Sequence, residues 1–183
     1  MRILILLSVL IFPSILTAQE FDGVCLMRSE NSSWSGVMTE QGVLTVAHPN
    51  KKESVCFFSD GTNLVGVPGT LIRENSNVDI AIYRVEVPKW AKVKKHKIGK
   101  IKAPSATIIG YIGGTRTIRS GQYVSDGVVN GVPVVTYGCQ ATSGMSGSPA
   151  FYNDEIIGIQ FGGNSTSTDC VSVEEINKFL ELK

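Results

Sequence analysis

Short apolar runs bounded by Gly, Asn, Asp and Ser fill the chain between residues 22 and 86. Runs of this kind are typical of strands joined by tight turns, and Glu40-Gln41-Gly42 and Ser59-Asp60-Gly61 fit the chemistry of hairpin turns. Six strands without a long amphipathic helix predict a small barrel or sandwich. The expected strands are Gly23–Arg28, Ser33–Met38, Gly42–Ala47, Ser54–Phe58, Leu64–Ile72 and Ile80–Val85.

The same pattern returns in the second half of the chain, which ends in one helix. Ser172 and Glu175 have the spacing of a capping box, and Ile176, Phe179 and Leu180 form an apolar face behind it. The strands expected before the helix are Ala106–Ile112, Thr115–Tyr123, Gly127–Val129, Pro133–Tyr137, Ser148–Tyr152, Glu155–Phe161 and Thr168–Val171.

A basic linker, residues 87–104, separates an N-terminal barrel over residues 19–86 from a C-terminal barrel and terminal helix over residues 105–183. Its lysines could form a patch for anions or nucleic acid, but the aromatic residues of single-strand binders are limited to Trp90, so a solvated linker is favoured. Solvation is also the simplest role for His96. The lysines are Lys89, Lys92, Lys94, Lys95, Lys97, Lys100 and Lys102.

Residues 1–18 have the pattern of a secretory signal. Arg2 precedes an apolar run from Ile3 to Phe12, which is short for a membrane span, and Ala18 is a suitable cleavage position. An uncleaved anchor is the alternative. We expect a secreted, periplasmic or extracellular protein with no stable membrane anchor after cleavage. Without Arg2 the chain has 16 basic and 16 acidic residues, so its net charge does not favour a nucleic-acid partner.

Export makes the four cysteines candidates for two disulfides, with three possible pairings. The cysteines are Cys25, Cys56, Cys139 and Cys170. A metal site is disfavoured because the cysteines are far apart in sequence and the chain has only two histidines. We expect neither a metal nor another cofactor.

Candidate chemistry centres on the stretch Thr142-Ser143-Gly144-Met145-Ser146-Gly147-Ser148-Pro149. A serine between glycines can be a nucleophile, because the glycines allow a tight turn with no side chain in the way. The amides of Gly144 and Ser146 could then stabilise a developing oxyanion. Taken alone the motif is weak, since such turns are common in β proteins.

A nucleophilic serine needs a base, and that base needs an orienting group. His48 ends the apolar run Gly42–Ala47, where a functional residue would lie at the rim of a barrel. Asp79 precedes an apolar strand, and an acid in such surroundings must find partners because its burial is costly. A structural histidine and a turn-capping aspartate are the alternatives for these two positions.

Together, Thr45-Val46-Ala47-His48, Asp79-Ile80-Ala81 and Gly144–Pro149 resemble the three catalytic motifs of trypsin/chymotrypsin-like serine proteases, in their chain order. Residues 144–163 look closest to bacterial glutamyl endopeptidases and compact viral relatives. The resemblance implies two six-stranded antiparallel Greek-key barrels with a C-terminal helix. It also implies that Ser146 is the nucleophile, His48 the base and Asp79 its orienter, with Gly144 and Ser146 as the oxyanion hole.

The same resemblance assigns a substrate site. Gln140, Ala141 and Thr142 would form the base and one wall of the specificity pocket, with Gln160 and Gly162 on the other wall. The strand Ile159, Gln160, Phe161 and Gly162 would pair with the substrate backbone. No aspartate is at the base, and the histidine and threonine of the glutamyl enzymes are replaced by Gln160 and Ala141. We expect a neutral residue, polar or small and apolar, before the scissile bond.

Two further expectations follow from the resemblance. Met145 occupies the position of the aspartate that receives the new amino terminus in trypsin-like zymogens, so we expect no such activation step. The neighbouring strands of the family would pair Cys25 with Cys56, and Cys139 with Cys170.

The sequence therefore predicts a secreted, monomeric serine endopeptidase that acts on polypeptides through an acyl-enzyme. A catalytically silent pseudoprotease that binds other proteins is one alternative. A viral protease that processes its own polyprotein is another.

Overall fold

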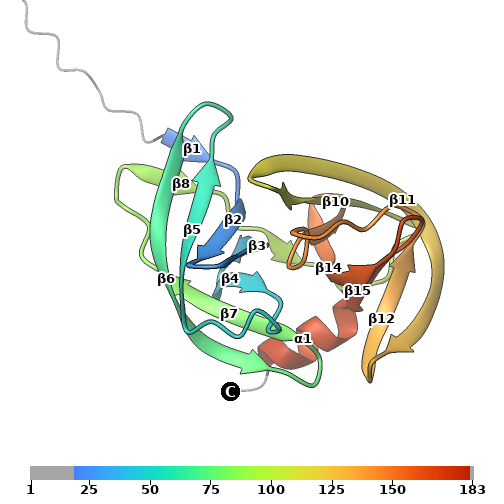
Figure 1. The fold of residues 1–183 in the computed structure, drawn as a ribbon. Coiled ribbons are helices and arrows are strands. Elements are labelled where there is room, and N and C mark those ends of the chain that lie inside the picture. Colours follow the sequence, from blue (N-terminus) through green and yellow to red (C-terminus); the bar gives the residue numbers. More distant parts are fainter. Residues whose placement is uncertain (1–18, 182–183) are drawn as a thin grey trace, which may run out of the picture.

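Two closed β-barrels lie side by side in a computed structural model that describes residues 19–181 (Figure 1). The two six-stranded antiparallel barrels and the C-terminal helix form a chymotrypsin-like fold, which confirms the fold class expected from the sequence. The predicted signal segment lies outside the described residues. Within the described part of the chain, no helix is long and apolar enough to cross a membrane.

The N-terminal barrel has the strand order β2-β3-β4-β7-β6-β5. Strands β5 and β6 expose and bury successive residues in turn, as the two-residue period of a strand requires, and their buried side chains fill the barrel with Trp34, Phe58 and Leu44. The strands are β2 (Val24–Ser29), β3 (Ser32–Thr39), β4 (Gly42–Thr45), β5 (Glu53–Ser59), β6 (Leu64–Asn75) and β7 (Ile80–Val85).

The C-terminal barrel has the strand order β13-β10-β11-β12-β15-β14, closed by pairing of β13 with β14. Two strands expected separately are one, because β11 continues through an irregularity between Tyr123 and Ser125. Figure 1 shows this long strand bending around the outside of the barrel. The strands are β10 (Ser105–Ile112), β11 (Thr115–Val129), β12 (Val132–Tyr137), β13 (Pro149–Tyr152), β14 (Glu155–Gly163) and β15 (Thr168–Ser172).

The linker is more ordered than its composition indicates. It contains β8 (Ala91–Val93), which pairs in parallel with β1 (Gln19–Phe21), and β9 (Lys97–Ile98), which joins the edge of β14. Three of its lysines form ion pairs with acidic residues of the barrels: Lys94 with Asp154, Lys95 with Glu40 and Lys102 with Asp126.

The prediction for His96 was wrong. Its side chain is only 5% exposed, and its ring packs at a tilt against Phe151 of β13, with the ring centres 4.7 Å apart, instead of facing solvent. The linker crosses between the barrels here, so tertiary packing buries a residue whose basic neighbours in sequence suggested exposure.

The four cysteines are free thiols in this structure, so the predicted disulfides Cys25–Cys56 and Cys139–Cys170 stay a prediction. The predicted partners are neighbours: burial and then Cys56 raise the pKa of Cys25, and burial and then Cys139 raise the pKa of Cys170. Buried thiols with raised pKa values stay protonated and pack as small apolar groups.

The C-terminal helix α1 (Val173–Glu181) begins at its predicted cap. The amide of Glu175 donates a 3.4 Å hydrogen bond to Ser172 Oγ, which satisfies one of the helix's free amide groups. The buried Ile176 and Phe179 face the barrels, and the guanidinium of Arg73 from β6 lies 4.4 Å over the Phe179 ring. The helix of the second barrel therefore also contacts the first.

Replacement of Ser172 by alanine should destabilise the protein by about 1 kcal/mol, because the Glu175 amide loses its acceptor. Thermal unfolding should show a melting temperature lower by about 2–4 °C. Ser165→Ala is the matched control, since Ser165 is exposed, and it should leave the melting temperature unchanged. Equal effects of the two variants would contradict the capping role.

Candidate active site

His48 and Asp79 form a hydrogen-bonded pair at the rim of the first barrel. His48 Nδ1 lies 2.8 Å from Asp79 Oδ2, with 47% of the His48 side chain exposed and 11% of the Asp79 side chain exposed. The other carboxylate oxygen of Asp79 accepts the amides of Ala47 at 2.9 Å and His48 at 2.7 Å. A carboxylate with these three partners can be buried without a large desolvation cost, and it holds the imidazole in one orientation.

The backbone of Asp79 adopts a conformation that few side-chain-bearing residues use. Its φ is 54°, in the left-handed region that aspartate tolerates better than most residues. The residue lies between the turn after β6 and the first residue of β7, and its side chain turns back toward β4. Unusual backbone of this kind tends to occur at functional sites, where the surroundings hold it in place.

The serine loop is a tight turn between Cys139 and β13. The Met145 amide donates to Thr142 O at 3.1 Å, and Gly144 has a φ of +95°. At Gly147, with a φ of +84°, an added Cβ would lie 1.9 Å from Ser35 O and 2.3 Å from Thr45 Oγ1. The glycines on either side of Ser146 therefore meet two different needs: Gly144 makes the turn, and Gly147 lets the loop touch the first barrel.

The amides in this loop divide into two groups. Those of Met145, Gly147 and Ser148 donate to backbone carbonyls. The amides of Gly144 and Ser146, which the sequence predicts as the oxyanion hole, have no hydrogen-bond acceptor among the residues that the structure describes. Two unpartnered amides with one residue between them can both donate to an oxyanion.

Ser35 is a residue that the sequence reasoning missed. It is fully buried on β3 of the first barrel, and its amide donates to Ser146 O at 2.7 Å. Its hydroxyl donates to Gly144 O at 3.5 Å and accepts the Tyr111 amide of β10 at 3.0 Å. Thr45 Oγ1, three residues before His48, donates to Ser35 O at 2.6 Å. Ser35 thus joins the serine loop to the strand that leads to His48.

Ser35 could not be singled out from sequence, because a serine on a predicted strand carries no sign of its partners. Those partners lie between ten and more than one hundred positions away along the chain.

A cleft of about 920 Å³ lies between the two barrels beside the His48–Asp79 pair. The first barrel contributes His48 and Asp79, and the second contributes Phe161 and Gly162 from the predicted substrate strand. The cleft can therefore admit an extended chain between the histidine and β14.

The structure narrows the predicted substrate strand. Ile159 is fully buried and pairs with Pro149 of β13 on one side and Val171 of β15 on the other, so it has no free edge for a substrate. Gln160 is bonded to the serine loop through its backbone amide and carbonyl. The part of β14 that can accept a new strand begins at Phe161 and ends at Gly163.

Ala141, on one predicted wall of the specificity pocket, contacts the residues that follow Gly162 of the other wall. The Ala141 amide donates to Asn164 O at 2.9 Å, and a Cβ added to Gly163 would lie 2.6 Å from the Ala141 side chain. Gln160 is 98% buried, and its Oε1 has no hydrogen-bond partner among the described residues. Gln140 is exposed and Thr142 half-buried. One predicted wall therefore holds a buried, uncharged polar side chain.

Ser146 and His48 belong to different barrels, and no hydrogen bond joins their side chains within residues 19–181. Such contacts are often long in a free enzyme and shorten in the substrate complex. The described residues also contain no cluster of three or more His, Cys, Asp or Glu side chains suited to a metal ion.

A double-barrel fold with an oriented histidine at the cleft and a serine loop with free amides defines the class of serine peptidases. The sequence profile of the trypsin-like peptidase domain matches residues 23–159, and the chain belongs to this family. A search of curated protein sequences found no match.

Solved structures with a similar fold include the Rv3671c protease of M. tuberculosis in its inactive form, with a TM-score of 0.73 and 19% identity over 86% of this chain and 87% of that chain. The serine protease of a human pathogenic astrovirus has a TM-score of 0.65 and 13% identity, over 82% and 88% of the two chains. Deg5 has a TM-score of 0.71 and 16% identity, over 85% and 86%. At these identities the similarity concerns the fold.

Replacement of Ser35 by alanine should lower kcat for peptide hydrolysis about tenfold, because the Tyr111 amide loses its acceptor and the Gly144 carbonyl loses a donor. Steady-state kinetics on a cleavable peptide measure the effect, and circular dichroism checks that the fold is retained.

Ser33→Ala is the control for this variant, since Ser33 lies on the same strand and is exposed. An unchanged kcat in Ser35→Ala would show that the serine loop does not depend on this residue.

Proposed function

We propose that this protein is a secreted serine endopeptidase in which Ser146, His48 and Asp79 form the catalytic triad. The observation that carries the proposal is the His48 Nδ1–Asp79 Oδ2 hydrogen bond of 2.8 Å at the mouth of the cleft. Because Nδ1 is bound to Asp79, the ring's other nitrogen, Nε2, is the one available to a nucleophile. Secretion rests on the signal-like pattern of residues 1–18.

In this mechanism His48 Nε2 removes the proton of Ser146 Oγ as the oxygen attacks the carbonyl carbon of the scissile bond. Asp79 stays ionised and stabilises the imidazolium that forms. The imidazolium then gives its proton to the leaving amine, and an acyl group remains on Ser146. Water, deprotonated by His48, attacks this ester; the released acid leaves, and the Ser146 hydroxyl is restored.

The negative charge that develops on the carbonyl oxygen needs two donors, for which we propose the Gly144 and Ser146 amides. Their lack of other acceptors in the described chain supports this role. The turn that holds them is built from the Thr142–Met145 hydrogen bond, with Met145 fully buried below it. This turn needs no buried ion pair, which supports a loop that forms without cleavage at the amino terminus.

We propose that the residue before the scissile bond is small and neutral. The Ala141 side chain lies against Gly163 and so limits the room for a substrate side chain, and Gln160 offers an uncharged acceptor, Oε1, that lacks a partner among the described residues. A substrate carboxylate would meet this oxygen with no cation to compensate, and a substrate ammonium would be buried without a counter-charge. Alanine and serine fit the size, and a serine hydroxyl can also donate to the free oxygen.

A second candidate function is that of a pseudoprotease that binds polypeptides without cleaving them. The observation that favours it is the lack of a hydrogen bond between Ser146 and His48 in the described chain. A chemical test separates the two functions, because only an activated serine reacts with a fluorophosphonate.

A fluorophosphonate probe should label the wild-type protein on Ser146, and Ser146→Ala should abolish the labelling. His48→Ala and Asp79→Asn should each reduce kcat/KM for a peptide substrate by about four orders of magnitude, since either change disables the base. Labelling is read by mass spectrometry of the modified peptide.

Exposed Ser165 serves as the control position, since Ser165→Ala should be labelled as the wild type is. A properly folded wild-type protein that resists the probe would favour the pseudoprotease.

In a peptide library with every residue at the position before the scissile bond, cleavage should be fastest after alanine and serine. Peptides with lysine, arginine, aspartate or glutamate there should be cleaved at least about a hundredfold more slowly, the rate equivalent of a few kcal/mol of charge burial. Sequencing of the products locates the cleavage sites. Efficient cleavage after an acidic residue would contradict the proposed role of Gln160.

A further inference from the structure

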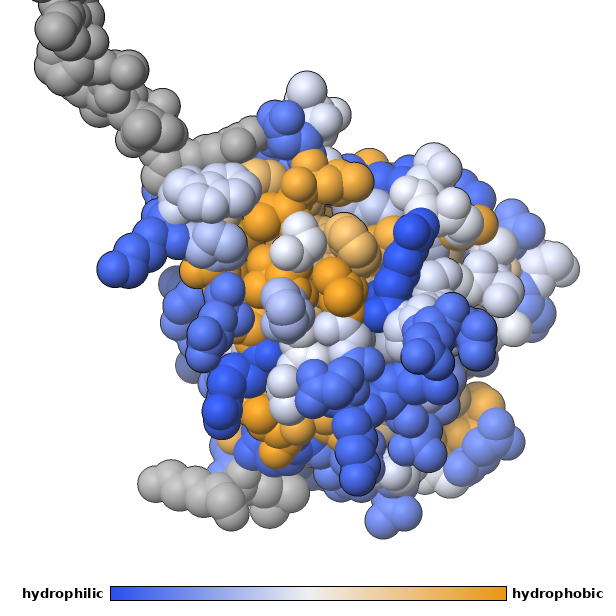
Figure 2. Space-filling model, turned by 60° about the vertical axis from the view of Figure 1, so that its left-hand side comes forward, coloured by the Kyte–Doolittle hydropathy of each residue, from blue (hydrophilic) through white to orange (hydrophobic). Residues whose placement is uncertain are grey.

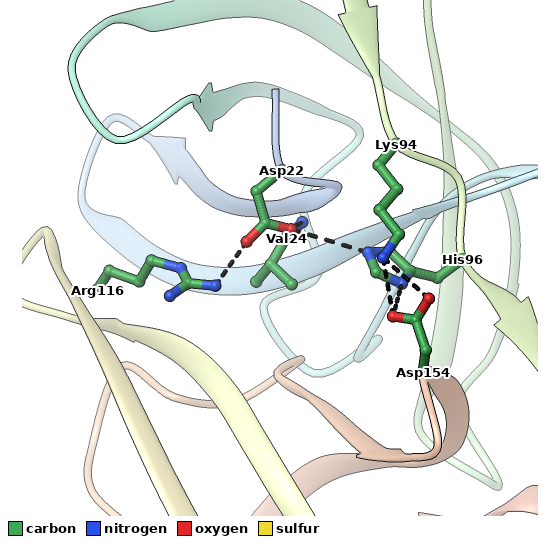
Figure 3. Close-up of polar contacts among 6 residues, drawn as sticks. All are labelled: Asp22, Val24, Lys94, His96, Arg116 and Asp154. Carbon is green, nitrogen blue, oxygen red and sulfur yellow. Dashed lines mark hydrogen bonds and ion pairs between the residues drawn. The ribbon is translucent and has the colours of Figure 1, made fainter. Parts of the chain in front are cut away.

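Charged side chains from both barrels and the linker meet around His96 (Figure 3). Asp22 lies 3.8 Å from His96 Nε2, and Asp154 lies 3.7 Å from His96 Nδ1. Each carboxylate also has a cation of its own: Arg116 lies 2.5 Å from Asp22, and Lys94 lies 2.8 Å from Asp154. Figure 3 shows the ring between the two carboxylates.

The five residues come from separate parts of the fold. Asp22 joins β1 to the first barrel, Arg116 is on β11, and Asp154 is in the turn between β13 and β14 of the second barrel. Lys94 and His96 belong to the linker, in the stretch between β8 and β9. His96 therefore lies where one barrel, the linker and the other barrel make contact.

His96 is buried, yet neither ring nitrogen has a hydrogen-bond partner among the described residues. A neutral imidazole has one N–H donor and one acceptor nitrogen, so in this place its acceptor would face a carboxylate oxygen. A protonated imidazole has two donors, one for each carboxylate. The surroundings of the ring are therefore complementary to its charged form.

Packing leaves the ring little freedom to avoid this arrangement. A Cβ added to Gly23 would lie 2.8 Å from His96 Cδ2, and the ring packs at a tilt against Phe151 with the ring centres 4.7 Å apart. The His96 amide donates to Met38 O at 2.8 Å, and the Lys94 amide donates to Phe21 O at 3.0 Å. The linker is thus hydrogen-bonded to β1 and to β3 on the two sides of residue 95, and the ring contacts Phe151 of the second barrel.

The cluster lines a second cavity, of about 1080 Å³, which shares no lining residue with the cleft that holds His48. Apolar side chains from both barrels, including Phe21 and Ile109, line it as well. Figure 2 shows apolar side chains gathered among polar ones on the face next to the grey amino-terminal segment. The barrels therefore meet at His96 as well as at Ser35 beside the serine loop and at the Arg73–Phe179 contact.

We propose that His96 is a positioning residue: its protonated ring clamps the two barrels together through Asp22 and Asp154 and so sets the distance between His48 and Ser146. The kinetic consequence rests on the proposed function, whereas the clamp itself does not. The clamp requires the charged form of the ring, because only the imidazolium attracts both carboxylates.

The carboxylates stay charged over the range in which histidine titrates. Burial raises the pKa of Asp22, but His96, the Val24 amide and Arg116 outweigh burial and lower the pKa to about 2. Lys94 lowers the pKa of Asp154. The other charged residues that line the cavity are Asp60, Lys92 and Lys95. Lysines and aspartates do not titrate between pH 5.5 and 8.5 at their usual pKa values, so the charges around the ring stay constant over that range.

The test compares wild type with His96→Gln, which keeps a polar side chain but cannot become charged. We subtract the melting temperature of the variant from that of wild type at each pH. This difference should be larger at pH 5.5 than at pH 8.5 by at least about 3 °C, which corresponds to about 1 kcal/mol of stability in a domain of this size. Lys95→Gln is the control, since its partner is Glu40 outside the cluster, and it should show no such pH dependence.

The kinetic arm uses the same proteins and a cleavable peptide. At pH 6, His96→Gln should lower kcat severalfold with KM unchanged, because the substrate edge of β14 is intact while His48 and Ser146 are misplaced. The ratio of wild-type to variant kcat should approach one at pH 8.5. A ratio that does not vary with pH would overturn the positioning role.

Asp154→Asn provides a second variant if His96→Gln does not fold, because the Asp154 side chain is 68% exposed. It should lose the same pH-dependent stability, whereas Lys94→Gln, which removes the other partner of Asp154, should change stability equally at both pH values. The clamp would be overturned if the difference in melting temperature between wild type and each of His96→Gln and Asp154→Asn did not change with pH. An inactive wild type with a pH-dependent difference would contradict the proposed function and support the clamp.

Discussion

The constraint on which the rest of this structure depends is that the residues proposed as the catalytic triad are divided between two barrels. His48 and Asp79 belong to the first barrel, and Ser146 belongs to the second. The path that joins them is short: Thr45 holds the Ser35 carbonyl, and Ser35 holds the carbonyls of Gly144 and Ser146. Each of these hydrogen bonds is buried or partly buried, so loss of one leaves a polar group without a partner. The geometry of the site is thus a property of the interface between the barrels.

Local backbone features are adapted to this interface. Gly147 has no room for a side chain because Ser35 and Thr45 lie against it, and Gly144 provides the left-handed turn that leaves two amides free. Asp79 has a left-handed backbone conformation. In this conformation one carboxylate oxygen accepts hydrogen bonds from two amides and the other lies beside the imidazole. The unusual conformations therefore occur where the chain must present a polar group in a fixed direction.

The linker takes part in the same organisation. Its composition resembles a solvated tether, but its two short strands are added to the edges of other strands, and its lysines pair with acids of both barrels. His96 of the linker is buried between two carboxylates and against an aromatic ring. Charge in this protein is arranged in pairs and small clusters that join separate elements, which is consistent with its nearly balanced content of acidic and basic residues.

The sequence by itself determined the class of fold, the division into two barrels, the terminal helix with its Ser172 cap, and the short list of candidate reactive residues. It could do so because strand periodicity, turn residues, capping and motif order are local properties of the chain. Only the tertiary structure decided the environment of residues distant in sequence. In the folded protein, Ser35 links the barrels, and His96 is buried although its lysine neighbours suggested exposure. The four cysteines are free thiols. Ile159 lies between two strands, and Ala141 lies against Gly163. Each of these outcomes depends on which distant segments pack together, and no local pattern carries that information.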